Sequence, residues 1–152
     1  MDTLLVEKQT TNIQEEFLPL NGTDFIELYV GNAKQSAHFY KTAFGFQSLA
    51  YSGLETGNRE CASYVLRQGK ITLILTTPYN SSSLVAEHIK NHGDGVKVIA
   101  FTVDDAEYSF AQTTERGAEP FLFPTVKSDA DGEIKIAGIK TYGEVIHLFV
   151  ER

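Results

Sequence analysis

The chain has 152 residues, of which 42% are hydrophobic and 22% charged, a composition typical of one soluble globular domain with a substantial core. Its net charge of −7 disfavours nucleic acid and anionic membranes as partners, because phosphate groups are bound by clustered cations. No apolar run approaches the roughly 20 residues needed to cross a bilayer, and the N-terminus lacks the features of a signal peptide. Cys61 is the single cysteine, which excludes an internal disulfide and fits a reducing cytoplasm.

The first expected elements follow a polar arm, residues 1–22, and a turn at the sequence NGTD. Residues 25–30 alternate in the manner of a strand, with one face formed by Ile26, Leu28 and Val30 and the other by Phe25, Glu27 and Tyr29. Asn32 is a suitable N-cap for a helix over 33–43, and Gly45 is a suitable stop. Strands are then expected over 46–52, 61–68 and 71–77, with Gly69 and Lys70 in a tight hairpin between the last two.

The second half of the chain repeats this order. After a capped helix within 81–95, we expect a strand over 96–103, a helix over about 105–116 capped by Asp104 or Asp105, and strands over about 120–127, 133–141 and 145–151. The sequence FIELYVGNAKQSAHFY (25–40) also has an echo in VIAFTVDDAEYSFAQT (98–113). Phe25 and Val98, like Ala33 and Ala106, are 73 positions apart.

This period predicts an α+β domain, residues 23–152, made of two βαβββ units at about 24–78 and 96–152. One such unit cannot bury its sheet face alone, so two half-sheets complete one another. We expect a curved, mostly antiparallel sheet with helices on its outside and a concave face open to ligands.

Paired βαβββ units with these strand–helix openings resemble the vicinal oxygen chelate superfamily, which includes glyoxalase I, extradiol dioxygenases and bleomycin-resistance proteins. Longer blocks are similar to the N-terminal domain of the 4-hydroxyphenylpyruvate dioxygenase family. These blocks are VGNAKQSAHFYKTAFGFQSLAYSGLETGNRE (30–60), RQGKITLIL (67–75), HGDGVKVIAFTVDD (92–105) and KTYGEVIHLFVER (140–152). The resemblance covers roughly 24–152, in order.

The resemblance implies a cytoplasmic, homo-oligomeric, two-domain enzyme of tyrosine and phenylalanine catabolism. It would use Fe(II) and O₂ to convert 4-hydroxyphenylpyruvate to homogentisate and CO₂, with iron held by two His and one Glu. In this family all three ligands belong to the C-terminal catalytic domain, which we expect to be absent from this chain. Hydroxymandelate synthase shares the architecture and is one alternative. A stand-alone, metal-free binding protein of the glyoxalase or bleomycin-resistance kind is another.

The resemblance also implies where metal donors would lie, namely on the first and last strand of each unit. Those positions correspond here to Phe25 and Val98, and to Ile74 and His147. Three of the four are hydrocarbons that offer no lone pair, and one imidazole does not hold Fe(II). We therefore expect no catalytic, cofactor-binding or metal-binding residue in this chain, and no dioxygenase activity from it alone.

Four other polar residues are functional candidates. Glu27 shares a strand face with Phe25, and we interpret it as a partly solvated carboxylate rather than a general base. His88 and His92 are four positions apart, as in a zinc-binding helix, but no third ligand is evident, so a surface position is expected for both. His38 is likewise expected at the surface, and HGDG (92–95) is expected to be a turn.

Overall fold

Both halves of the chain fold in the order strand, helix and three strands, over the residues that the computed structural model describes, 16–129 and 132–152. The first half contains β1 (Gly22–Tyr29), α1 (Ala33–Phe44), β2 (Gln47–Ser52), the short 3-10 helix η1 (Leu54–Thr56), β3 (Cys61–Gln68) and β4 (Ile71–Pro78). After α2 (Leu84–His92), the second half contains β5 (Gly95–Thr102), α3 (Ala106–Glu115), β6 (Pro120–Asp129), β7 (Gly132–Lys140) and β8 (Ile146–Glu151). The expected α+β architecture of two βαβββ units is confirmed.

The strands form one mixed sheet in the order β2-β3-β4-β1-β5-β8-β7-β6. β1 and β5 pair antiparallel at its centre, and each pairs in parallel with the last strand of its own half, β4 or β8. The remaining neighbours are antiparallel. Exchanging the two halves reproduces this order, so the repeat is a structural duplication about the β1–β5 pair.

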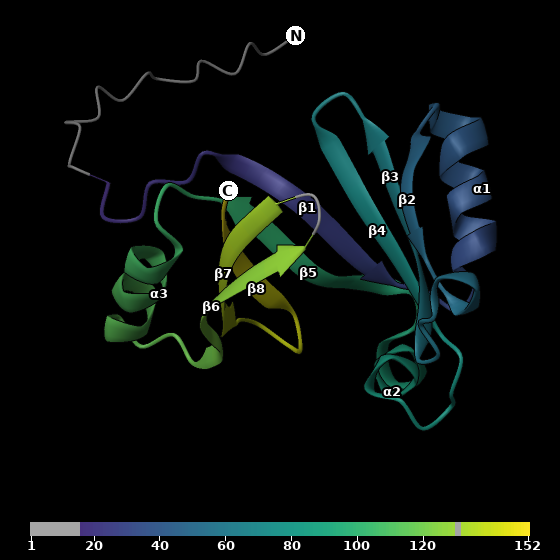
Figure 1. The fold of residues 1–152 in the computed structure, drawn as a ribbon. Helices are drawn as coiled ribbons and strands as arrows, with labels where there is room; N and C mark the ends of the chain where they lie inside the picture. The colour runs from purple at the N-terminus through teal and green to yellow at the C-terminus, as the bar shows by residue number, and fades with distance from the viewer. Residues whose placement is uncertain (1–15, 130–131) are drawn as a thin grey trace, which may run out of the picture.

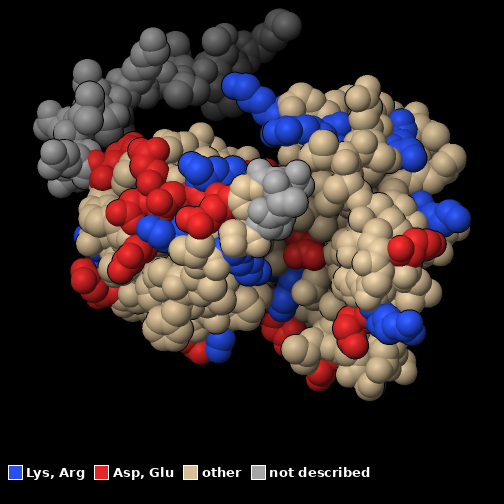
Figure 2. Space-filling view, in the orientation of Figure 1, with Lys and Arg blue, Asp and Glu red and all other residues tan. Residues whose placement is uncertain are grey.

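Helices α1 and α3 lie at opposite outer sides of the sheet, as Figure 1 shows. α2 lies below the sheet in that view, beside the ends of the first-half strands, and has no counterpart in the second half. The opposite sheet face is concave, and α2 lies at one end of it, where His88 contacts Tyr29. In Figure 2 a hollow separates the two halves, and acidic side chains gather over the half that contains α3.

Capping residues begin and end α1 where the sequence predicts. The Asn32 side chain accepts a hydrogen bond from the Gln35 backbone N–H at 3.0 Å, which satisfies a donor that the first turn leaves free. The helix ends at Gly45, whose φ of 76° is accessible to glycine at little cost. In α3 the cap is Asp105, which accepts from the Tyr108 N–H at 2.8 Å.

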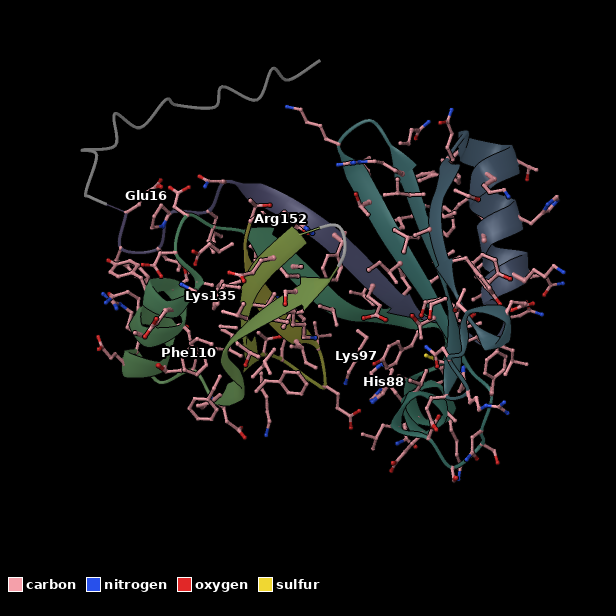
Figure 3. The ribbon with its side chains drawn as sticks, in the orientation of Figure 1. Glu16, His88, Lys97, Phe110, Lys135 and Arg152 are labelled. Carbon is pink, nitrogen blue, oxygen red and sulfur yellow. The ribbon has the colours of Figure 1, made fainter. Side chains whose placement is uncertain are left out.

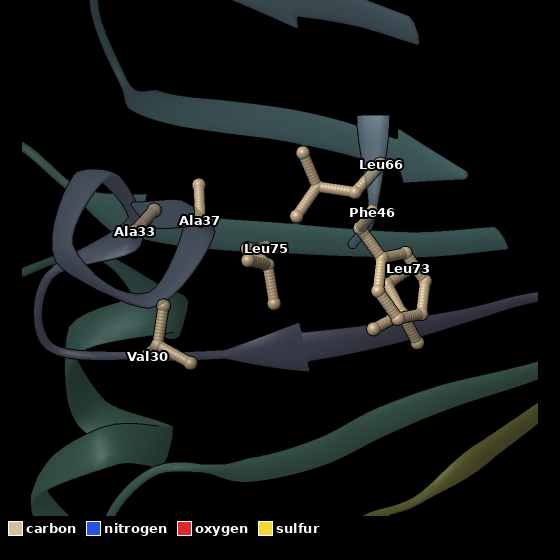
Figure 4. Close-up of a cluster of buried hydrophobic side chains, with 7 residues drawn as sticks. All are labelled: Val30, Ala33, Ala37, Phe46, Leu66, Leu73 and Leu75. Atoms are coloured by element: carbon tan, nitrogen blue, oxygen red, sulfur yellow. The ribbon is translucent and has the colours of Figure 1, made fainter. Parts of the chain in front are cut away.

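Each outer helix covers its own hydrophobic cluster. Under α1 the two small helix residues Ala33 and Ala37 allow close approach to the sheet, and the cluster is completed by Val30, Phe46, Leu66, Leu73 and Leu75 (Figure 4). Under α3 the corresponding cluster contains Val103, Ala106, Phe110, Ala137, Ile139 and Phe149. A third cluster of Ala100, Ile136 and Val150, with Phe25 and Leu148 packed against it, lies on the concave face.

The segment that leads into β1 packs against the second half. The Arg116 guanidinium lies 4.0 Å from the centre of the Phe17 ring, and Leu18 contacts the cluster under α3. Asn21 Nδ2 donates to Asp104 Oδ1 at 2.7 Å. Most of the expected arm, residues 1–15, lies outside the described residues.

Across residues 16–129 and 132–152, none of the helices has the length and apolarity that crossing a bilayer requires.

Leu75 is completely buried between α1 and the sheet, so its truncation should leave a cavity. We expect Leu75→Ala to lower the free energy of unfolding by about 2–5 kcal/mol, measured by urea denaturation. Leu49→Ala is the matched control, because Leu49 is 57% exposed and its replacement should change stability by less than about 0.5 kcal/mol. Equal effects of the two substitutions would contradict the assignment of this core.

Candidate functional site

A chain of hydrogen bonds holds Glu27 on the concave face of the first half. Thr76 Oγ1 donates to Glu27 Oε1 at 2.7 Å, and Ser63 Oγ lies 2.9 Å from the same Thr76 oxygen. Because the Thr76 proton is committed to the carboxylate, the Ser63 hydroxyl is the donor of the second bond. The neighbouring strands β3, β4 and β1 each supply one member, so the order of the sheet brings these residues together.

Burial sets the protonation behaviour of this group. It raises the pKa of Glu27, although the hydrogen bond from Thr76 partly opposes the change. Burial also raises the pKa of Tyr29 to about 12, with a smaller contribution from the nearby Glu27 charge. Glu27 is thus half-buried, as the sequence suggested, and its environment favours the protonated carboxyl.

Three of the four superfamily donor positions face the concave side as expected. Phe25 packs against the cluster around Ala100 and Val150, and together with Ile74 it lines a cavity of about 450 Å³. Val98 pairs directly with Glu27, so the two side chains share a sheet face. None of these three side chains can donate to a metal ion.

The structure contradicts His147 as the fourth donor position, because β8 pairs with β5 in a different register from that of β4 with β1. In the first half β1 and β4 pair with Ile26 opposite Leu73, and an offset of 73 would place Ile99 opposite Ile146. The structure instead pairs Ile99 with His147. The register of β8 against β5 is thus shifted by one residue relative to that of β4 against β1. Because side chains alternate along a strand, this shift turns His147 to the face that packs against α3.

Leu148 takes the place that the repeat assigned to His147. It pairs with Ala100 and Gly138 and packs into the cluster on the concave face. Gly138 leaves room for it, because a Cβ atom there would lie 2.6 Å from Leu148 Cδ2. Phe25, Ile74, Val98 and Leu148 together present only hydrocarbon, so the concave face does not fit Fe(II) or another metal at these positions.

His147 packs among aromatic rings on the other face. The ring centre lies 5.3 Å from that of Phe101 and 6.1 Å from that of Tyr142, in edge-to-face contacts. Its Nε2 is buried and has no hydrogen-bond partner among the described residues. Burial lowers the pKa of His147, which favours the neutral imidazole in this setting.

The cavity beside Phe25 has charged walls. Asp24, Arg67 and Arg152 line it together with apolar residues from β2, β3 and β4. Arg152 donates through Nε and Nη2 to the two oxygens of Asp24 at 3.0 and 2.8 Å, a bidentate pair. These hydrogen bonds hold the pKa of Asp24 below its ordinary value. With Arg152 paired to Asp24, the charged residues that line the cavity have a net charge of +1, from Arg67.

A second group of polar residues lies where α2 meets the loop between β7 and β8. The expected surface position is wrong for His88 and confirmed for His92, which is 45% exposed. His88 is 6% exposed, and its Nδ1 lies 3.2 Å from Glu144 Oε2. His92 Nε2 lies 3.2 Å from the same oxygen. Glu144 is 56 residues beyond His88, so only the folded chain brings it there.

Burial and this contact affect the two partners differently. Burial lowers the pKa of His88, and the hydrogen bond with Glu144 partly restores it. The hydrogen bonds from His88 and His92 lower the pKa of Glu144. In Figure 3 His88 and Lys97 lie close to one another between α2 and β5.

The remaining candidates are structural. His38 is exposed on α1, as expected. HGDG forms the predicted turn, in which Gly93 has a φ of 73° and Asp94 Oδ1 accepts from the Gly31 N–H at 2.8 Å. The turn therefore joins the end of α2 to the end of β1.

Comparison with known proteins identifies relatives along almost the whole chain. A family model described as the N-terminal part of hydroxyphenylpyruvate dioxygenase (HPPD) matches residues 15–152. The 4-hydroxyphenylpyruvate dioxygenase of Danio rerio is 46% identical over 127 residues, which cover 83% of this chain and 32% of that protein. The enzyme of Coccidioides posadasii is 45% identical over 144 residues, which cover 86% and 36%. The chain spans about a third of the length of these curated relatives.

Solved structures agree on the fold. A mutant of 4-hydroxymandelate synthase from Streptomyces coelicolor superposes with a TM-score of 0.82 at 30% identity, covering 88% of this chain and 39% of that one. Methylmalonyl-CoA epimerase from Mycobacterium tuberculosis has a TM-score of 0.70 at 17% identity, covering 91% and 93%, which shows a shared fold alone. The expected vicinal oxygen chelate fold is confirmed.

The raised pKa of Glu27 predicts that the stability of the fold depends on pH. Since its pKa is higher in the folded than in the unfolded state, stability falls as pH rises from about the ordinary value of 4.5 through the raised pKa. Glu27→Gln removes this loss and keeps an oxygen for Thr76. We expect the variant to be more stable than the parent chain at pH 7, with the difference vanishing as pH falls below 4.5.

Urea denaturation across this pH range measures the effect. Glu60→Gln is the control, because it makes the same change of charge at an exposed side chain. A pH dependence of Glu27→Gln that matches that of Glu60→Gln would show that Glu27 is not penalised by burial.

Proposed function

Because this chain belongs to the family of hydroxyphenylpyruvate dioxygenase N-terminal domains, we propose that it is the non-catalytic N-terminal domain of a 4-hydroxyphenylpyruvate dioxygenase. The whole enzyme would use Fe(II) to convert 4-hydroxyphenylpyruvate and O₂ to homogentisate and CO₂. The iron ligands, two His and one Glu, would belong to a C-terminal domain of the same polypeptide. The enzyme would be cytoplasmic.

The observation that carries this proposal is the hydrocarbon lining of the concave face. Phe25, Ile74 and Val98 occupy positions where metal-binding relatives of this fold would place donors, and Leu148 fills the fourth. A 2-oxo acid and dioxygen need a metal with open coordination positions, and this lining supplies no ligand for one. The length of the curated relatives, about three times the part matched here, leaves room for a catalytic domain.

The outer surface of the domain supports a role in contact with further protein. The sheet ends in β2 on one side and β6 on the other, and an edge strand offers unpaired backbone groups. On β6, Phe121 and Phe123 are 51% and 68% exposed, and Phe39 on α1 is 54% exposed. Large exposed aromatic side chains at an edge favour burial against another domain or another copy of the chain, consistent with a homo-oligomer.

Hydroxymandelate synthase is the second candidate. The synthase from Streptomyces coelicolor has this fold at 30% identity, which supports a common architecture without separating the products. A stand-alone binding protein is less well supported, because the relatives at 45–46% identity are dioxygenases about three times longer than the matched region. The coding sequence beyond Arg152 tests this directly, since a catalytic domain requires an open reading frame there.

We expect the chain joined to its C-terminal domain and loaded with Fe(II) to release CO₂ from 4-hydroxyphenylpyruvate and to yield homogentisate. The 152-residue chain alone, treated identically, should release none. Oxygen uptake, CO₂ release and chromatography of the product measure both outcomes. Hydroxymandelate as the product would select the synthase, and activity of the isolated chain would contradict a non-catalytic domain.

A further inference from the structure

We propose that His88, His92 and Glu144 form a binding site for a divalent transition-metal ion, for which Zn²⁺ is the best match. The site lies between α2 and the loop that joins β7 and β8, apart from the four superfamily donor positions, and is independent of the dioxygenase function proposed above. It replaces the expectation of a wholly metal-free chain, while the hydrocarbon positions of the concave face remain without a ligand.

The distances between the donors fit a small metal ion. His88 Nδ1 and His92 Nε2 each lie 3.2 Å from Glu144 Oε2, and all three donor atoms lie within 4.8 Å of one another. Donors bound tetrahedrally about 2.0–2.1 Å from Zn²⁺ are separated by about 3.4 Å. The two distances to Glu144 already agree with this value. The distance between His88 Nδ1 and His92 Nε2 would have to shorten to about 3.4 Å on binding, through a change in the rotamer of the exposed His92 side chain.

Helical spacing places the two imidazoles side by side. His88 and His92 are separated by one turn of α2, and their ring centres lie 4.6 Å apart. His88 is fixed by burial and by an edge-to-face contact with Tyr29 at 5.5 Å. The helix itself is anchored by Ser83, whose side chain accepts from the Ala86 N–H at 3.1 Å. The His88 imidazole is therefore held rigidly, and the helix fixes the position of the His92 backbone one turn away.

A well-ordered turn presents the carboxylate. Thr141 bonds to the Val145 carbonyl through its backbone N–H at 3.1 Å and its hydroxyl at 3.0 Å, which closes the loop around Glu144. Lys97 Nζ donates to the Glu144 carbonyl oxygen at 2.6 Å and ties the loop to β5. The backbone that carries Glu144 is therefore held in place, which limits the conformational entropy lost on binding.

The donor set selects the class of metal. Two imidazoles and one carboxylate suit Zn²⁺ and neighbouring late transition metals, whereas Ca²⁺ and Mg²⁺ prefer all-oxygen ligands. Glu144 is 54% and His92 45% exposed, so water can complete a fourth position. The Lys97 ammonium near Glu144 opposes a bound cation and lowers the affinity.

Hydrogen bonds from the two imidazoles to Glu144 offer an explanation of the same geometry without a metal. In that case the cluster only fastens α2 to the loop between β7 and β8. A metal ion would fasten the same two segments more strongly, because it binds the folded chain and not the dispersed donors of the unfolded one. Zinc binding with a defined stoichiometry separates the two explanations.

The test is equilibrium dialysis of the 152-residue chain against Zn²⁺ at neutral pH, followed by metal analysis. We expect one Zn²⁺ per chain and a higher Tm with Zn²⁺ than with a chelator. His92→Gln and Glu144→Gln should each raise the Kd for Zn²⁺ by more than about tenfold, since even loss of an indirect partner costs 10- to 100-fold. Both side chains are about half exposed, so these variants should fold, as far-ultraviolet circular dichroism will show.

The control is His38→Gln, because His38 is an exposed histidine of α1 outside the cluster. It should bind Zn²⁺ like the parent chain. Co²⁺ provides a second readout, since its visible absorption is stronger in a four-coordinate site than in a six-coordinate one. Absence of stoichiometric Zn²⁺, unchanged binding in both His92→Gln and Glu144→Gln, or equal loss in His38→Gln would overturn the proposal.

Discussion

The antiparallel pairing of β1 with β5 is the contact on which the rest of the structure depends. Each βαβββ half buries one face of its sheet under its own helix, but its first strand would be an open edge without the other half. Joining the two first strands removes both edges at once and creates the continuous concave face. Two register shifts, one of them beside Glu27 and Leu28, bend this central pair where the halves meet.

Chemistry on the concave face follows from how the last strands are placed against that pair. The register of β8 against β5 is shifted by one residue relative to that of β4 against β1. This shift turns His147 away from the concave face and places Leu148 on it. The displacement changes the side chain at a donor position from an imidazole to a hydrocarbon, which is a larger chemical change than most single substitutions. Glu27 remains there as a half-buried carboxylate, which accepts a hydrogen bond from Thr76, and Thr76 in turn bonds to Ser63.

The group at His88 has a different origin, since α2 belongs to neither copy of the repeat. The helix connects the halves and lies against Tyr29 of β1, which places its two histidines beside the loop that precedes β8. A connecting segment is freer to acquire a function than a duplicated one, because its side chains need not satisfy the packing of both halves. Burial of His88 and the turn around Glu144 then determine the geometry.

The sequence by itself determined the duplication, the order of strands and helices, the caps at Asn32 and Gly45 and the hydrocarbon character of Phe25, Ile74 and Val98. These features depend on local periodicity and on side-chain chemistry, which can be observed along the chain. Only the tertiary structure decided the face of His147 and the meeting of His88 with Glu144. A strand's register depends on packing against its neighbours, and contacts between residues 56 positions apart leave no periodic trace in the sequence.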